Sequence, residues 1–281
     1  MVVEVEPVEA PPVAVPRRRG TSRVPVALIV PAGLGLAFLV LPLAGLVVRA
    51  PWSTLPGRLA QPGILTALRL SLQTATLATL ACLLVGVPLA WLLARVDFPG
   101  RRLVRALVTV PLVLPPVVGG IALLLVFGRR GLLGAWLYDT FGVSLPFTTT
   151  GVVVAEAFVA MPFLVIAVEG ALRGADVRYE EAAATLGAGR WATFVHVTLP
   201  LVAPGIAAGA VLCWARALGE FGATITFAGN VPGRTETVPL AVFVALQRSP
   251  DAAIALSLVL VTVSIAVLVA LRGRWLGALR T

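Results

Sequence analysis

The stretch "EEAAATLGAGRWATFVHVTLP", residues 180–200, is a polar, alanine-rich run in an otherwise very apolar chain. Three consecutive alanines at 182–184 favour a helix with very little side-chain bulk. Gly187 indicates the end of that helix, because glycine accepts the left-handed conformation that often follows a last turn. Residues 190–197 predict a short second helix, and Pro200 begins the next apolar run. The stretch therefore predicts two short helices joined by a turn.

The chain around this stretch has the composition of an integral membrane protein. Of its 281 residues, 59% are hydrophobic and 12% are charged, whereas soluble domains carry about 25% charged residues. A membrane-spanning helix needs about 20 mostly apolar residues. Six such runs predict an all-α integral membrane protein with six transmembrane helices, at residues 24–48, 68–94, 104–127, 148–170, 200–228 and 251–271.

The ends of the chain differ from this central part. Residues 1–23 are rich in Pro, Val and Glu and predict a disordered cytoplasmic tail. Residues 24–271 form the expected transmembrane domain, and residues 272–281 a short cytoplasmic tail. The first apolar run is too long for the 7–15-residue core of a signal peptide, so we expect it to remain as a first span.

The positive charge of the chain comes from arginine alone. All 22 basic residues are Arg, and they lie in short clusters between the apolar runs, which is typical of membrane orientation signals and not of nucleic-acid binding. Fourteen fall on the side shared by both termini and by residues 171–199, seven fall on the other side, and Arg216 lies within a predicted span. The positive-inside rule therefore predicts that both termini and the opening stretch are cytoplasmic.

Sequence motifs for bond chemistry are missing. The chain has no Lys, so it cannot hydrolyse ATP through a P-loop, which needs one. It has one His, His196, and no HExxH or GxSxG motif. Cys82 and Cys213 lie inside apolar runs and are interpreted as buried small side chains. We therefore expect no catalytic residue, no metal site and no cofactor.

Several polar or flexible residues interrupt the predicted spans. Arg216 and Glu220 are charges inside the fifth span, where such groups usually face the bundle interior and are paired. Thr224, Thr226 and Asn230 follow and offer neutral hydrogen bonds. Together these five residues are candidates for a translocation pathway, with a purely structural ion pair and helix packing as the alternatives.

Three further features leave alternatives open. Glu156, within the fourth span, is either a proton site of a secondary transporter or a polar contact to another helix. Gly205 and Gly209 form a GxxxG pattern, a common helix-packing face at which a homodimer seam is one option. Arg173, Asp176, Glu180 and Glu181 are spaced to share one helix face in the loop at 171–199.

The opening stretch resembles the cytoplasmic signature loop of permease subunits of bacterial ABC importers. The pattern is Glu181-Ala182-Ala183, three residues, Gly187, nine residues, Val197, one residue, then Leu199-Pro200. The resemblance implies a type I, MetI-like permease fold and a loop that seats in a separate ATPase subunit. The residues to which it assigns this coupling role are Glu181, Ala182, Ala183, Leu186 and Gly187.

Two further segments resemble the molybdate branch of the oxyanion importers, namely residues 111–134 and 215–243. This likeness implies a transport subunit, not an enzyme, that moves molybdate into the cytoplasm by alternating access across the bacterial plasma (inner) membrane. Its implied partners are the lipid bilayer, two copies of an ABC ATPase subunit, an extracytoplasmic molybdate-binding protein and a second permease copy in a homodimer. Sulfate, thiosulfate or tungstate are alternative substrates. An ion-coupled secondary transporter that uses Glu156 or Glu220 is the alternative class.

Overall fold

The computed structural model describes residues 26–278, without the side chains of residues 26, 58, 59, 268 and 270–278. Regular structure in this range is entirely helical. The chain divides into two compact units, Met1–Gly45 and Leu46–Thr281. The first unit holds most of α1 (Val26–Val48), and all other helices belong to the second. The predicted tail at 1–23 lies outside the described residues.

The helices of the second unit follow one another with short connections. In chain order they are α2 (Leu55–Leu59), α3 (Pro62–Arg95), α4 (Arg101–Val113), α5 (Pro116–Phe127), α6 (Gly134–Phe141), α7 (Thr149–Gly174), α8 (Arg178–Thr185), α9 (Arg190–Thr193), the π-helix η1 (Phe194–Thr198), α10 (Leu199–Leu218), α11 (Gly222–Phe227), α12 (Val238–Arg248) and α13 (Pro250–Ala278).

Five of the described helices are long and apolar enough to cross a membrane, and a bent pair brings the number to six. The five are α1, α3, α7, the continuous helix Arg190–Leu218, and α13. The sixth predicted span, at 104–127, is not a straight helix. It consists of α4 and α5, with a bend of 118° between them. Pro115 and Pro116 permit this break, because they lack the backbone donors that a continuous helix would use there.

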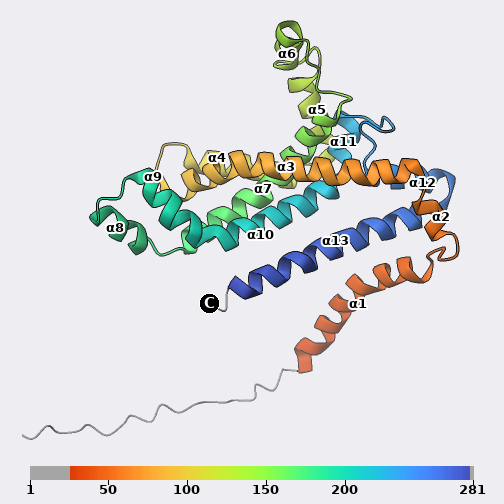
Figure 1. The fold of residues 1–281 in the computed structure, drawn as a ribbon, viewed down its shortest axis with the longest axis horizontal. Helices are drawn as coiled ribbons and strands as arrows, with labels where there is room; N and C mark the ends of the chain where they lie inside the picture. Colours follow the sequence, from red (N-terminus) through yellow and green to blue (C-terminus); the bar gives the residue numbers. More distant parts are fainter. Residues whose placement is uncertain (1–25, 279–281) are drawn as a thin grey trace, which may run out of the picture. The chain divides into compact units, whose positions relative to one another are not determined.

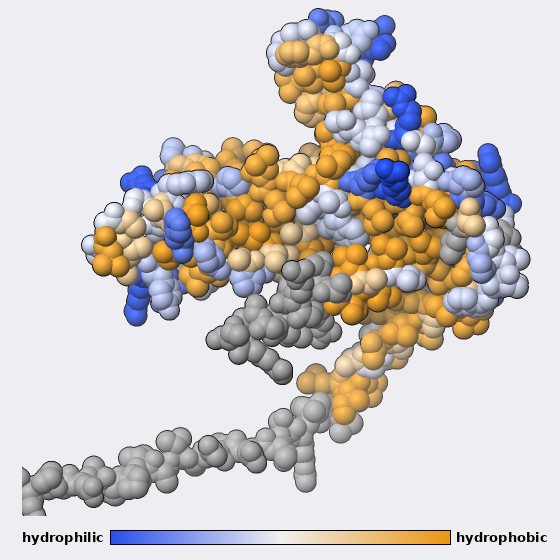
Figure 2. Space-filling view, in the orientation of Figure 1, coloured by the Kyte–Doolittle hydropathy of each residue, from blue (hydrophilic) through white to orange (hydrophobic). Residues whose placement is uncertain are grey.

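The core of the second unit lies between α3, α7 and α10, which run side by side (Figure 1). Small side chains let these helices approach closely: Ala75, Ala78, Cys82, Ala160 and Cys213 are all fully buried. Both cysteines are free thiols in this core, as the sequence predicted. On the face drawn in Figure 2, apolar residues cover most of the length of these helices, and hydrophilic residues gather near their ends.

The GxxxG pattern of α10 packs against α7 of the same chain. A Cβ on Gly205 would lie 2.3 Å from the Ala171 Cβ, and one on Gly209 would lie 3.0 Å from the Ala167 Cβ. Only hydrogen fits at these two positions. The interpretation as a helix-packing face is therefore confirmed, whereas a homodimer seam at these two glycines is wrong because α7 occupies that face.

The predicted fifth span at 200–228 extends too far at its C-terminal end. Helix α10 ends at Leu218, and after three residues a separate helix, α11, begins at Gly222. Helix α11 packs on α5 and α7. A Cβ on Gly120 of α5 would lie 1.7 Å from the Thr226 hydroxyl, so α5 and α11 touch at backbone distance. The break at 219–221 gives the chain the room to make this contact.

Candidate functional site

The turn after α8 has the geometry that the sequence predicted. Gly187 has a φ of +84°. Its amide donates to the Ala184 carbonyl at 3.0 Å, and the Ala188 amide donates to the Ala183 carbonyl at 3.0 Å. These two bonds define a Schellman motif, in which the residue after the helix takes the left-handed conformation. Gly187 thus ends α8 and turns the chain toward α9.

The approach to α8 differs from the sequence-based prediction. Arg173, Asp176, Glu180 and Glu181 do not share a helix face, because α7 ends at Gly174 and α8 begins at Arg178. The Asp176 carboxylate instead accepts a hydrogen bond from the Arg178 amide at 3.0 Å. These residues do have spacings of three and four, but the sequence pattern did not reveal that the helix is interrupted between Gly174 and Arg178.

An ion pair ties α8 to the end of α3. The Arg95 Nη2 atom lies 2.9 Å from the Glu180 Oε1 atom, and both side chains are largely buried. A pair shielded from water in this way is held much more firmly than one on the open surface. Movement of α8 is therefore linked to a helix that runs through the whole core. The sequence-based reasoning did not assign this role to Arg95, which is 85 residues from its partner.

The segment from α8 to α9 exposes large apolar side chains. Leu186 is 88% exposed, Trp191 76% and Tyr179 60%. The candidate coupling residues Glu181, Ala182 and Gly187 are also exposed, and Ala183 is half-buried. Because these apolar groups lie on one short segment and are exposed, the segment has the character of a protein-docking surface.

The second short helix predicted at 190–197 is not a separate element. Residues Arg190–Leu218 form one helix, with a π-helical turn at Phe194–Thr198. Single π-turns inside α-helices are frequent at functional positions. The docking surface is thus joined without a break to the span formed by α10. His196 in this turn is exposed, and its Nδ1 atom lies 3.0 Å from the Ala192 carbonyl oxygen.

The charged pair predicted in the fifth span is formed. The Arg216 Nη1 atom lies 2.5 Å from the Glu220 Oε2 atom, and the Glu220 side chain is 1% exposed. The other carboxylate oxygen of Glu220 accepts from the Ala223 amide at 2.8 Å. Glu220 therefore holds Arg216 and also binds a free backbone donor in the first turn of α11, so the two charges fix the break between α10 and α11.

The three neutral pathway candidates lie on α11 and just beyond it. Thr224 is fully buried, and its hydroxyl has no hydrogen-bond partner among the described residues. The buried side-chain oxygen of Asn230 likewise has none within this part of the chain. Thr226 is half-buried and donates to the Gly222 carbonyl of its own helix at 2.8 Å. Two of the three thus keep unsatisfied polar atoms inside the protein, where a polar group without a partner is costly.

Glu156 makes a polar contact between two helices. Its Oε1 atom accepts a hydrogen bond from the Thr74 hydroxyl of α3 at 2.9 Å, and the residue is 1% exposed. The sequence-based reasoning considered Glu156 but not Thr74. A threonine inside an apolar run gives no signal of its own, and only the packing of α3 against α7 brings the two together.

Comparisons with known proteins agree with the arrangement of spans and exposed loop. Residues 86–279 match the family model described as "Binding-protein-dependent transport system inner membrane component". The chain belongs to this family of inner-membrane transport subunits, and the predicted fold class and the prediction of a multi-pass transport component are confirmed.

Individual relatives cover most of the chain. It is 48% identical over 244 residues to the molybdenum transport system permease protein ModB of Mycobacterium tuberculosis, covering 87% of this chain and 92% of the relative. It is 39% identical over 232 residues to the sulfate transport system permease protein CysT of Escherichia coli, covering 82% and 80%. A bacterial alginate ABC transporter, solved in complex with a pentasaccharide-bound periplasmic protein, has the same fold, with a TM-score of 0.71 and 19% identity over 87% of this chain and 91% of that one.

Proposed function

We propose that this chain is the permease subunit of an ABC importer for molybdate. The observation that carries the proposal is the difference between two relatives of similar coverage: 48% identity to a molybdenum permease against 39% to a sulfate permease. Both substrates are tetrahedral dianions. Tungstate has the same shape and charge and stays within the proposed substrate class.

The exposed α8–α9 segment supports a role in coupling. We assign Glu181, Ala182, Ala183, Leu186 and Gly187 to the contact with a separate ATPase subunit. A displacement of this segment can be transmitted to the membrane-spanning helices through two connections. The Arg95–Glu180 ion pair connects it to α3. The continuous helix Arg190–Leu218 connects it to the break before α11. ATP binding would thereby move α10 against its neighbours and change which side of the membrane the pathway faces.

The pathway itself is proposed to run past the polar residues at the break. Arg216, Glu220, Thr224, Thr226 and Asn230 lie close together in the chain, around the break and α11. Arg216 keeps 26% of its side chain exposed, so its guanidinium is accessible to an anion. Glu220 reduces the net charge to zero and prevents a dianion from being trapped, because a site that conducts must also release its ligand.

The assembly follows from the same family likeness. Two copies of this permease, two ATPase subunits and one extracytoplasmic binding protein make up the proposed importer. We place both chain termini and the α8–α9 segment in the cytoplasm, since the arginine excess lies on that side. The binding protein delivers the oxyanion from the opposite side and does most of the selecting.

Uptake by the reconstituted importer tests this function. Labelled molybdate is offered to vesicles that carry the permease and its cognate ATPase, with the binding protein and ATP, and sulfate is added in excess. We expect uptake that requires ATP and all three proteins and that sulfate does not abolish. Uptake abolished by sulfate would assign the subunit to sulfate transport. Uptake without ATP or ATPase would contradict the importer and favour a secondary transporter.

A further inference from the structure

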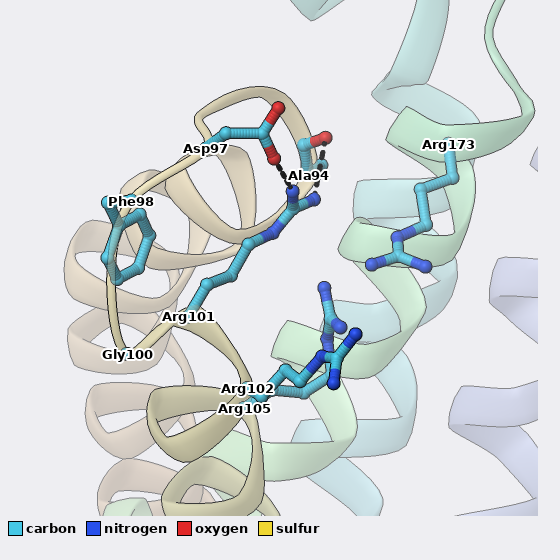
Figure 3. A pocket seen from close by; sticks show the side chains of 8 residues that line it. All are labelled: Ala94, Asp97, Phe98, Gly100, Arg101, Arg102, Arg105 and Arg173. Atoms are coloured by element: carbon cyan, nitrogen blue, oxygen red, sulfur yellow. Dashed lines mark hydrogen bonds and ion pairs between the residues drawn. The ribbon is translucent and has the colours of Figure 1, made fainter.

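A basic pocket lies at the end of the bundle where α3 is joined to α4, beside the end of α7 (Figure 3). We name it the arginine pocket; its volume is about 860 Å³, within the range of ligand sites in proteins. Its lining residues are Ala94, Asp97, Phe98, Gly100, Arg101, Arg102, Arg105 and Arg173. None of them belongs to the docking surface or to the proposed pathway.

The charges in this pocket do not balance. Arg101 pairs with Asp97. Glu169 serves two arginines with a single oxygen, because its Oε1 atom lies 2.7 Å from Arg105 Nη2 and 2.8 Å from Arg173 Nη2. Among the described residues, the Arg102 guanidinium has no ion-pair partner. Four guanidinium groups therefore face two carboxylates, which leaves two positive charges without a counter-charge.

The direction of the side chains adds to this excess. In Figure 3 the guanidinium groups of Arg102 and Arg105 point from α4 toward that of Arg173 on α7. Their shared contact with the Glu169 Oε1 atom explains why Arg105 and Arg173 converge, whereas none of the ion pairs among the described residues brings Arg102 to this point. Like charges that point toward one another across a gap repel, and this cost is offset when an anion lies between them.

We propose that the arginine pocket binds a phosphate-type oxyanion, tetrahedral and doubly charged when free. Such a group brings the two negative charges that are missing, and guanidinium groups bind its oxygens in pairs of parallel hydrogen bonds. Arg102 and Arg173 are its main ligands, since Arg105 donates both Nε and Nη2 to Glu169. The site is separate from the transport pathway and needs no transport to be filled.

Two sources can supply this chemistry. One is a free oxyanion from the aqueous phase, with inorganic phosphate as the simplest form. The other is the phosphodiester of an anionic lipid headgroup, which brings one of the two missing charges, since basic pockets between membrane helices bind such headgroups. The lipid source has local support, because Leu103 and Leu107 of α4 are exposed close to the arginines in the chain and offer contact for acyl chains.

The test uses the complete permease–ATPase complex and measures binding, not transport. In discs of neutral phosphatidylcholine, inorganic phosphate is titrated calorimetrically. In a second arm, complexes purified from phosphatidylglycerol–phosphatidylcholine vesicles are analysed for retained phosphatidylglycerol by native mass spectrometry. The variants are Arg102→Gln, Arg173→Gln and, as a matched loss of charge elsewhere, Arg130→Gln, whose side chain is exposed.

We expect binding in one arm to weaken roughly tenfold for each pocket arginine removed and to be unchanged in Arg130→Gln. If the pocket variants bind inorganic phosphate more weakly, the natural ligand is a free oxyanion. If they retain less phosphatidylglycerol, the ligand is a lipid headgroup. Binding absent from both arms, or equal in all variants, would overturn the proposal. If Arg173→Gln fails to assemble, Arg102→Gln tests the proposal by itself. Arg102 is exposed, so its replacement should not prevent assembly.

Discussion

At the scale of single residues, the most informative position is Gly187. Its φ of +84° is a conformation that costs other residues roughly 1–2 kcal/mol. No heavy atom would lie within 4 Å of a Cβ placed there, so any effect of a substitution comes from the backbone and not from a clash. This permits a clean test of whether the turn after α8 matters for transport.

We expect Gly187→Val to lower ATP-dependent uptake about tenfold while the protein still inserts and assembles, because valine is especially poor in the left-handed region. The matched control is Gly189→Val. Gly189 also has open space around it, but its φ of −67° and ψ of 158° suit valine. Equal uptake by both variants would show that the geometry of this turn is not used in coupling.

This glycine was predictable from the sequence, whereas the partner of Glu180 was not. The alanine run and the following glycine specify a helix and its end through local preferences alone. The Arg95–Glu180 ion pair depends instead on the packing of α3 beside α7, and no local pattern encodes a contact 85 residues apart. The unpartnered oxygens of Thr224 and Asn230 are likewise a property of the packed interior.

At the scale of elements, close packing between α7 and α10 explains the glycines of α10. Among the described side chains, only that of Ala171 lies within 4 Å of a Cβ placed on Gly205. The contact is therefore a pairwise one, in which a methyl group on either helix fits only if the other helix has none.

Gly205→Ala should destabilise the complex by about 1–3 kcal/mol, the usual cost of overpacking. Adding Ala171→Gly should recover most of this loss, since it removes the clashing methyl group. Gly170→Ala, at a position on α7 with open space, is the control and should be nearly neutral. Thermal unfolding of the detergent-solubilised complex measures all four proteins. A double variant no more stable than Gly205→Ala would show that the two helices are not packed as described.

Element boundaries show where sequence patterns stop being sufficient. Apolar length placed the spans correctly, because the bilayer sets that length. It did not show that 104–127 bends by 118° or that 200–228 divides into two helices. Both regions contain prolines and glycines. Such residues permit a break in a helix but do not determine its angle. Helix α11 packs on α5 next to the bend, and this tertiary contact is not encoded in either local pattern.

At the scale of the whole molecule, the chain is a transport subunit, and we propose that it depends on a second protein for energy. Charge and composition predicted this division, since a chain without Lys lacks the residue on which P-loop ATP hydrolysis depends. We propose that the ATPase subunit docks on the α8–α9 segment, whose large apolar side chains are exposed.

Site-directed cross-linking tests that claim most directly. A benzophenone is attached at Leu186→Cys, and the control carries it at Leu132→Cys; the two positions are 88% and 84% exposed. Native Cys82 and Cys213 are fully buried and should not be labelled. We predict that illumination of the assembled complex joins the ATPase to position 186 and not to position 132. A cross-link at 132 alone, or at neither position, would contradict the docking of the ATPase on the α8–α9 segment.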